Sequence, residues 1–143
     1  MSEQIRAITL RNIKEVWSQG DMDLVDEIYD ANYVYHEPVS GEIHGRDGIR
    51  QLIMMWRTAM PDLEFTNHDM IVEGDKVAQR WTAVGTHQGE VMGIPATGKR
   101  ITVAGINIVR YANGKAVEEW TYWDALGWLQ QLGVVPPLGG GNG

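Results

Sequence analysis

The spacing of apolar residues changes at Pro61, and this change restricts the possible folds more than any other feature of the sequence. Before Pro61 the apolar residues recur every three or four positions, as they do along one side of a helix. After Pro61 they alternate with polar residues, which is typical of strands with one buried face. Helices followed by consecutive strands indicate the α+β class, with helices covering one face of a sheet.

Three helices are expected before Pro61. The first spans Ser2 to Gly20, and a short second helix contains residues 24–29. A β-prone stretch, Tyr33–His36, separates them from a third helix in which Ile49 to Trp56 follow the 3.6-residue period. Pro61 ends this helix because proline cannot continue it.

Four strands and a last helix are expected after Pro61. Asn113-Gly114 between the last two strands is the strongest hairpin signal among the turns. Because consecutive hairpins join antiparallel strands, we expect an antiparallel sheet, curved enough to close around a pocket. The final helix, Ala125–Leu132, ends at Gly133. The four strands are Leu63–Glu73, Lys76–Gly89, Arg100–Tyr111 and Lys115–Trp123.

The length of 143 residues fits a single domain, and no internal repeat is visible. Residues 1–135 are expected to form this domain. Residues 136–143 form a Pro/Gly-rich tail, which has too little apolar surface to order itself and is expected to be flexible.

The net charge and the composition limit the classes of molecule that the protein is expected to bind and the chemistry that it can perform. A net charge of −7 disfavours binding to nucleic acids or to membranes, because both present negative charge. No apolar run approaches the roughly 18 residues that cross a bilayer, and no signal-peptide-like stretch is present, so a cytoplasmic location is expected. The absence of cysteine excludes disulfides and thiolate chemistry.

Three sequence motifs for phosphate binding, metal binding and serine catalysis are incomplete or absent. Gly93–Arg100 matches a phosphate-binding loop except at its last position, where Arg100 replaces the required Ser or Thr. A strand pattern follows this run instead of a helix, so we interpret it as a hairpin loop. The histidines lack metal-ligand spacing and no Gly-x-Ser-x-Gly occurs. We therefore expect no metal, no cofactor and no serine nucleophile.

The last strand contains the main candidate catalytic residue, Asp124. Alternation places Glu118, Trp120, Tyr122 and Asp124 on one face. If this face lined the pocket, the aromatic surroundings would raise the pKa of the Asp124 carboxyl toward neutrality, as a general acid or base requires. Asp124 also directly precedes a helix, where aspartate is a favoured N-cap. Both interpretations remain open on the residues alone.

Other polar residues have two interpretations as well. His36 could reach the pocket or be a hydrogen-bonded structural residue. Arg80 could orient a substrate or pair with Glu118 or Asp124. His87 could contact a ligand or face solvent. The candidate substrate-binding residues are Trp17, Tyr35, Trp56, Arg80, Trp81, His87, Met92, Asn107 and Trp120.

Several segments resemble SnoaL-like polyketide cyclases and their ester cyclase relatives. Asp124 with Trp120 before it, Pro61-Asp62-Leu63, and His36 all fit the resemblance, which covers about residues 5–135. The longer matching segments are residues 80–89, 93–99, 113–115 and 126–133.

The resemblance implies a nuclear-transport-factor-two-like cone of three helices on a highly curved antiparallel sheet, usually a homodimer. It also implies intramolecular aldol ring closure of a hydrophobic aromatic polyketide ester, without metal or cofactor. The family's catalytic aspartate lies on the last strand before the terminal helix, and Asp124 matches it. Asp124 would then protonate the developing alkoxide, while His36 would polarise a carbonyl or orient Asp124.

Two alternatives remain on the same fold, because a fold does not determine a reaction. One is hydroxylation, hydration or dehydration of a hydrophobic small molecule, which would need a second acid/base group across the pocket. The other is a non-catalytic small-molecule or protein-binding module, with a shallow or filled cone and Asp124 serving only as a cap.

Overall fold

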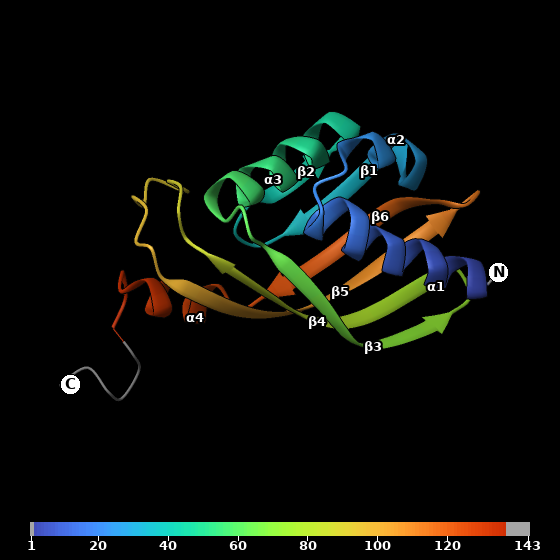
Figure 1. Ribbon diagram of the computed structural model, residues 1–143. Coiled ribbons are helices and arrows are strands. Elements are labelled where there is room, and N and C mark those ends of the chain that lie inside the picture. Colours follow the sequence, from blue (N-terminus) through green and yellow to red (C-terminus); the bar gives the residue numbers. More distant parts are fainter. Residues whose placement is uncertain (1, 137–143) are drawn as a thin grey trace.

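The computed structural model describes residues 2–136 and has helices packed on one face of a curved six-stranded sheet (Figure 1). The predicted α+β class is confirmed. Residues 137–143 of the expected tail lie outside the described residues. Among residues 2–136, no helix is long and apolar enough to cross a membrane.

Three helical segments precede most of the sheet, as expected, but their details differ. The first helix, α1 (Ser2–Arg11), continues as a π-helical segment, η1 (Asn12–Ser18). The second consists of a 3₁₀ turn, η2 (Met22–Leu24), followed by α2 (Val25–Ile28). The other helices are α3 (Gly45–Ala59) and α4 (Ala125–Leu132).

The sheet has the strand order β2-β1-β6-β5-β4-β3. All neighbouring strands are antiparallel except β1 and β6, which are parallel. The prediction of a purely antiparallel sheet is wrong at this pair, because β1 and β6 are far apart in sequence and no hairpin sets their relative direction. The strands are β1 (Tyr29–Glu37), β2 (Gly41–His44), β3 (Glu64–Glu73), β4 (Lys76–Thr86), β5 (Arg100–Ala112) and β6 (Lys115–Trp123).

The sheet bends where the strand register shifts. One irregularity lies between Asn67 and Asp69 in β3, and another lies between Arg110 and Tyr111 in β5. Such irregularities increase the local twist and bend a strand. The curved sheet wraps around one side of α1 and α3, as Figure 1 shows.

The buried apolar residues form two clusters. One includes the fully buried Tyr29, Tyr33 and Ile53, and the other includes Ile101 and Trp128. Side chains of α3 pack against both clusters, so this helix joins the two ends of the core. Fully burying a large apolar side chain contributes about 1.5–3 kcal/mol, so the clusters supply most of the stabilisation of this architecture.

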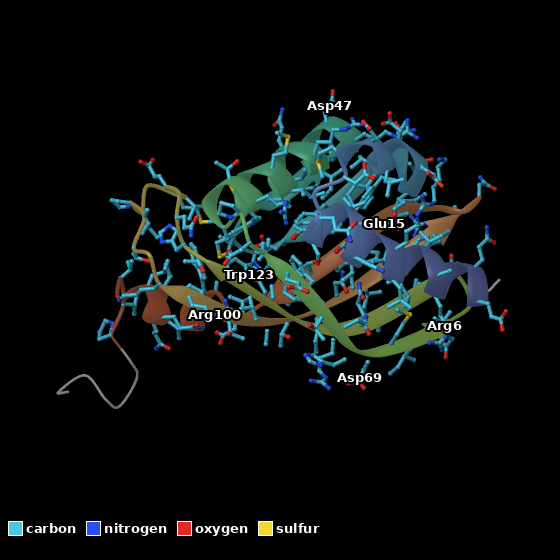
Figure 2. All side chains as sticks on the ribbon, in the orientation of Figure 1. Arg6, Glu15, Asp47, Asp69, Arg100 and Trp123 are labelled. Carbon is cyan, nitrogen blue, oxygen red and sulfur yellow. The ribbon has the colours of Figure 1, made fainter. Side chains whose placement is uncertain are left out.

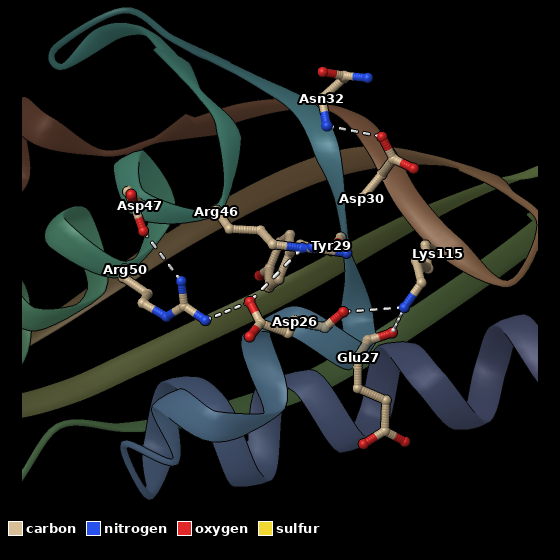
Figure 3. A network of polar contacts seen from close by, with 9 residues as sticks. All are labelled: Asp26, Glu27, Tyr29, Asp30, Asn32, Arg46, Asp47, Arg50 and Lys115. Carbon is tan, nitrogen blue, oxygen red and sulfur yellow. Dashed lines mark hydrogen bonds and ion pairs between the residues drawn. The ribbon is translucent and has the colours of Figure 1, made fainter.

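A surface network ties α2 to α3 and to the start of β6 (Figure 3). Lys115 Nζ donates to the backbone carbonyls of Asp26 at 3.0 Å and Glu27 at 2.8 Å. Arg50 Nη2 donates to the Asp26 carboxylate at 2.5 Å. Carbonyls at a helix C-terminus lack intrahelical partners, so Lys115 stabilises the end of this short helix.

The connection between β4 and β5 contains residues 93–99 of the run Gly93–Arg100, Arg100 begins β5, and no helix follows this run. At its base, His87 N donates to Lys99 O at 2.9 Å and Gly98 N donates to His87 O at 2.8 Å. The run that resembled a phosphate-binding loop therefore lies in a connection between antiparallel strands, as predicted.

Packing of Trp81 over Gly105 gives a first testable prediction. A Cβ atom at Gly105 would lie 2.3 Å from the Trp81 ring, so Gly105→Ala is expected to destabilise the fold by about 1–3 kcal/mol. Trp81→Phe replaces the indole with a smaller ring. Gly105→Ala should therefore destabilise the Trp81→Phe variant less than it destabilises the unmodified protein. Urea unfolding of the four proteins in this double-mutant cycle measures the coupling; strictly additive effects would contradict the contact.

Candidate functional site

A cavity of about 90 Å³ lies between the sheet and the helical segments η1, α3 and α4. Its wall is mainly aromatic. Trp56 of α3 packs edge-to-face on Trp123 of β6 and Trp128 of α4, with ring centroids 5.4 and 5.3 Å apart. Figure 2 shows Trp123 near the end of the sheet closest to α4. The apolar and aromatic lining residues are Ile13, Trp17, Trp56, Met60, Leu63, Phe65, Trp81, Ala83, Ile101, Val103, Trp123 and Trp128.

Six polar residues line the cavity as well. Three of them form a row across the sheet, because they are cross-strand partners: Gln79 on β4, Asn107 on β5 and Thr121 on β6. The remaining polar lining residues are Tyr35, Glu37 and Glu119. The cavity therefore combines an aromatic wall with one polar region.

Glu119 is the centre of this polar region. Its side chain is buried, with 7% exposed, and its two oxygens accept three hydrogen bonds. Tyr33 Oη donates to Oε1, while Asn107 Nδ2 and Thr121 Oγ1 donate to Oε2, each at 2.7 Å. Burial raises the pKa of Tyr33 well above its ordinary value, and the negative charge of Glu119 raises it further. Tyr33 therefore remains a hydrogen-bond donor to Glu119.

Glu37 supplies a second carboxylate, at the end of β1. It is 5% exposed, and its Oε2 accepts hydrogen bonds from the backbone N–H groups of Val39 and Ser40. Its Oε1 has no hydrogen-bond partner among residues 2–136 and is not one of the fully enclosed atoms, and Glu37 is one of the residues that line the cavity. An oxygen of this kind can accept a proton from a bound molecule.

Two cavity-lining residues contain enclosed polar atoms without a partner in the described part of the chain: Asn107 Oδ1 and Trp128 Nε1. The amide orientation of Asn107 follows from its neighbour, because Nδ2 donates to a carboxylate that accepts only. Oδ1 must then face away from Glu119. Buried polar atoms usually have partners, so these two atoms are unsatisfied hydrogen-bonding groups of the residues that line the cavity.

The prediction placed the wrong face of β6 in the cavity. Glu119, Thr121 and Trp123 line it, whereas Trp120 and the other residues of the predicted face do not. Alternation separates two faces, but it does not say which is buried when both contain aromatic and acidic residues.

Asp124 is exposed and does not line the cavity. Its Oδ1 accepts a hydrogen bond from Gly127 N at 2.8 Å, at the start of α4. The N-cap interpretation is therefore correct. No contact tests a catalytic role for Asp124, which remains a prediction.

His36 also lies outside the cavity, on the opposite face of the sheet. Its Nε2 is 2.8 Å from Glu118 Oε2, and its ring stacks on Trp120 with centroids 5.6 Å apart. The hydrogen bond from His36, followed by that from Arg110, lowers the pKa of Glu118. The expectation that His36 reaches the pocket is not met, because it is on the same face as Glu118.

Arg80, His87 and Met92 do not line the cavity either. Arg80 Nε donates to Asp69 Oδ2 at 2.7 Å, so its partner is neither Glu118 nor Asp124. Figure 2 shows Asp69 on the side of the sheet away from the helices. His87 is buried with Nδ1 3.0 Å from Thr97 Oγ1. Met92 is exposed in the β4–β5 connection.

Five predicted residues do line the cavity, although their contact with a substrate remains a prediction: Trp17, Tyr35, Trp56, Trp81 and Asn107. The analysis of the sequence missed Glu37 and Glu119. Alternation along β1 could have placed Glu37 with Tyr35, two residues earlier on the same face.

The cavity adjoins a groove of about 580 Å³ between η1 and the start of β3, and both are lined by Ile13, Leu63 and Phe65. The cavity and the groove are therefore neighbours that share these three side chains. Among residues 2–136, no group of three or more His, Asp or Glu side chains is arranged to hold a metal ion.

Comparison with known proteins agrees with this architecture. Residues 7–132 match the SnoaL-like polyketide cyclase family. The chain belongs to this family. Aklanonic acid methyl ester cyclase DnrD from Streptomyces peucetius is 28% identical over 145 residues, covering 96% of this chain and 95% of that protein.

Two solved structures in the comparison have similar folds. AclR from Streptomyces galilaeus, a candidate hydroxylase, has a TM-score of 0.83 and 29% identity, covering 96% of this chain and 85% of that chain. A candidate polyketide cyclase from Acidithiobacillus ferrooxidans has a TM-score of 0.82 and 28% identity, covering 90% and 94% of the two chains. The SnoaL-like fold therefore includes relatives with different suggested reactions.

The cap at Asp124 gives a second testable prediction. Asp124→Ala removes the acceptor for Gly127 N and should destabilise the protein by about 1 kcal/mol. Asp124→Asn keeps an acceptor of the same shape, so its stability should match that of the unmodified protein. Chemical denaturation measures both. A loss of turnover by ~10²-fold in a stable Asn variant would instead support general acid catalysis by Asp124.

Proposed function

We propose that this protein is a cofactor-independent cyclase that closes a ring in a hydrophobic polyketide-type ester by general acid/base catalysis. Membership of the family and 28% identity to an aklanonic acid methyl ester cyclase support the class of reaction. The observation that carries the proposal is an aromatic cavity lined by a buried carboxylate, Glu37, one oxygen of which has no hydrogen-bond partner among residues 2–136.

The reacting end of the ester would occupy the cavity, and the rest of the molecule would extend into the adjoining groove. Trp81 and Trp123 provide large flat surfaces against which a planar ring can pack. Confinement between such walls brings the two reacting carbons together, which lowers the entropic part of the barrier to ring closure.

Glu37 would transfer the proton. Its free oxygen removes a proton from the carbon between two carbonyl groups of the ester, and the resulting enolate carbon attacks the ketone or aldehyde carbon. A carbon–carbon bond forms, the attacked carbonyl oxygen becomes an alkoxide, and Glu37 returns the same proton to that oxygen. Atoms and electrons balance without an oxidant, a reductant or a metal.

Glu119 would act differently, because all three of its hydrogen bonds are already made by protein groups. Its role is to hold Asn107 and Thr121 in place beside the bound ester. Tyr35 lies on the same face of β1 as Glu37. Burial raises the pKa of the Tyr35 hydroxyl, and the negative charge of Glu119 raises it further. Its hydroxyl therefore remains protonated and can donate to a carbonyl oxygen.

Incubation with aklanonic acid methyl ester in the presence of EDTA, without nicotinamide or flavin, tests the reaction. Ring closure is an isomerisation, so mass spectrometry should find a product with the mass of the substrate and a new retention time. A product heavier by one oxygen atom would support hydroxylation instead, and one lighter by water would support dehydration. Absence of conversion, with the ester bound, would support a binding module.

Glu37→Gln tests the assigned base and is our third prediction. Gln preserves the shape and an acceptor for Val39 N and Ser40 N, but it cannot take up the proton, so turnover should fall by ~10²-fold or more. Single-turnover rates measure this loss. Glu118→Gln is the matched control, because Glu118 lies on the opposite face of the sheet and its loss should leave turnover nearly unchanged. Equal rates in Glu37→Gln and the unmodified protein would remove Glu37 from the mechanism.

We also propose that the protein is a homodimer formed through the outer face of the sheet. One row of cross-strand partners on this face runs across β3, β4, β5 and β6, and it consists of Ile71, Ala78, Ile108 and Trp120. Exposed Ile106 and Tyr122 form the next row on the same face. Exposed apolar side chains grouped in this way, beside the Arg80–Asp69 ion pair in the second row, are typical of an interface between proteins.

Sedimentation velocity at micromolar concentration tests the dimer, our fourth prediction. The unmodified protein should sediment at twice the 16.0 kDa of one chain, and Ile106→Asp should yield monomers because a charge would be buried in the interface. Met54→Asp is a matched control on α3, since Met54 and Ile106 are similarly exposed, at 55% and 53%. A monomeric unmodified protein would contradict the dimer.

A further inference from the structure

We propose that the cavity binds hydrophobic ligands bearing a protonated amine more tightly than neutral or anionic ligands of the same shape. The inference rests on the proposed function only in placing the substrate in this cavity. It concerns binding, so it does not depend on ring closure or on Glu37 being the base.

The charges around the cavity are unbalanced. Glu37 and Glu119 line it, and no Lys, Arg or His is among the described residues of its wall. The donors to Glu119 are uncharged side chains, and those to Glu37 Oε2 are backbone N–H groups. Neither carboxylate takes part in an ion pair with a residue in the range 2–136.

Two carboxylates on the outer face of the sheet are paired with cations. Glu118 on the outer face lies 3.2 Å from Arg110, in addition to its contact with His36. Asp69 pairs with Arg80 at 2.7 Å. A cation attracts a buried carboxylate more strongly than an exposed one, because the effective dielectric constant is lower and water screens the pair less. A cationic ligand would supply the partner that the cavity wall lacks.

The remaining features of the wall favour the same ligand. The faces of indole rings carry partial negative charge and attract ammonium groups. Five of the six tryptophans line the cavity, and only Trp120 does not. No residue in the described part of the chain donates to Glu37 Oε1, or to Asn107 Oδ1, which is enclosed. An ammonium N–H can donate to Glu37 Oε1, whereas a carboxylate ligand would be repelled by it.

The test uses three fragments of matched shape, chosen small enough for the cavity: benzylammonium, benzyl alcohol and benzoate at neutral pH. Two-dimensional ¹H–¹⁵N NMR follows the indole N–H signals of the unmodified protein during titration with each. Benzylammonium should bind at least roughly tenfold more tightly than benzyl alcohol, and benzoate more weakly than both. Signals of the cavity tryptophans should shift, while that of Trp120 should stay in place.

Substitutions then assign the preference to the two carboxylates. Glu37→Gln and Glu119→Gln should each reduce the preference for benzylammonium over benzyl alcohol by roughly tenfold, since each removes one negative charge from the wall. Glu118→Gln, on the outer face, should leave it unchanged. If Glu119→Gln does not fold, Glu37→Gln and the comparison of the three fragments on the unmodified protein still decide the question.

Equal affinity for the ammonium and the alcohol would overturn the proposal, as would tighter binding of benzoate, or no binding of any fragment. Shifts at Trp120 alone would also overturn it, because they would place the fragment on the outer face. Failure of aklanonic acid methyl ester to react leaves these titrations unaffected. The two proposals can therefore fail separately.

Discussion

The buried carboxylate of Glu119 is the interaction on which the arrangement of the site depends. It joins Tyr33 of β1, Asn107 of β5 and Thr121 of β6 through three short hydrogen bonds. Burying a charge is unfavourable unless its hydrogen-bonding capacity is filled, and these donors fill it. Because the donors come from three neighbouring strands, the same interaction determines which side chains of each strand surround the cavity.

The two faces of the sheet have different chemical properties as a result. On the inner face, carboxylates are buried among aromatic rings and are bonded only to uncharged donors. On the outer face, Glu118 is paired with His36 and Arg110, and apolar side chains are exposed beside it. The inner face is therefore suited to binding a small molecule, and the outer face to contact with another protein surface.

The change of period at Pro61 was enough to predict the order of elements, because local spacing alone distinguishes helix from strand. It could not predict that β1 pairs with β6 in parallel, since this pairing joins segments distant in sequence. The four-residue strand β2 (Gly41–His44) was too short to give a periodic signal. The π-helical form of Asn12–Ser18 likewise had no signal in the spacing of its apolar residues.

Prediction of the site failed where the two faces of a strand had to be distinguished. Glu118 and Glu119 are adjacent acidic residues on β6, and only their tertiary neighbours decide which is buried. Choosing the wrong face placed Asp124 in the pocket, although its side chain caps α4. Trp17, Trp56 and Trp81 do line the cavity, because large aromatic side chains are usually buried, whichever face they occupy, and their contact with a substrate stays a prediction.

The central claim is that substrate is held inside the cone, beside Glu37 and Glu119, and not near Asp124 and His36. A crystal structure with the cyclised product of aklanonic acid methyl ester bound tests this most directly. The account predicts the new ring against Trp81, with its hydroxyl oxygen within hydrogen-bonding distance of Glu37 Oε1. Product bound on the outer face, in contact with His36 or Asp124 and leaving the cavity unchanged, would contradict it.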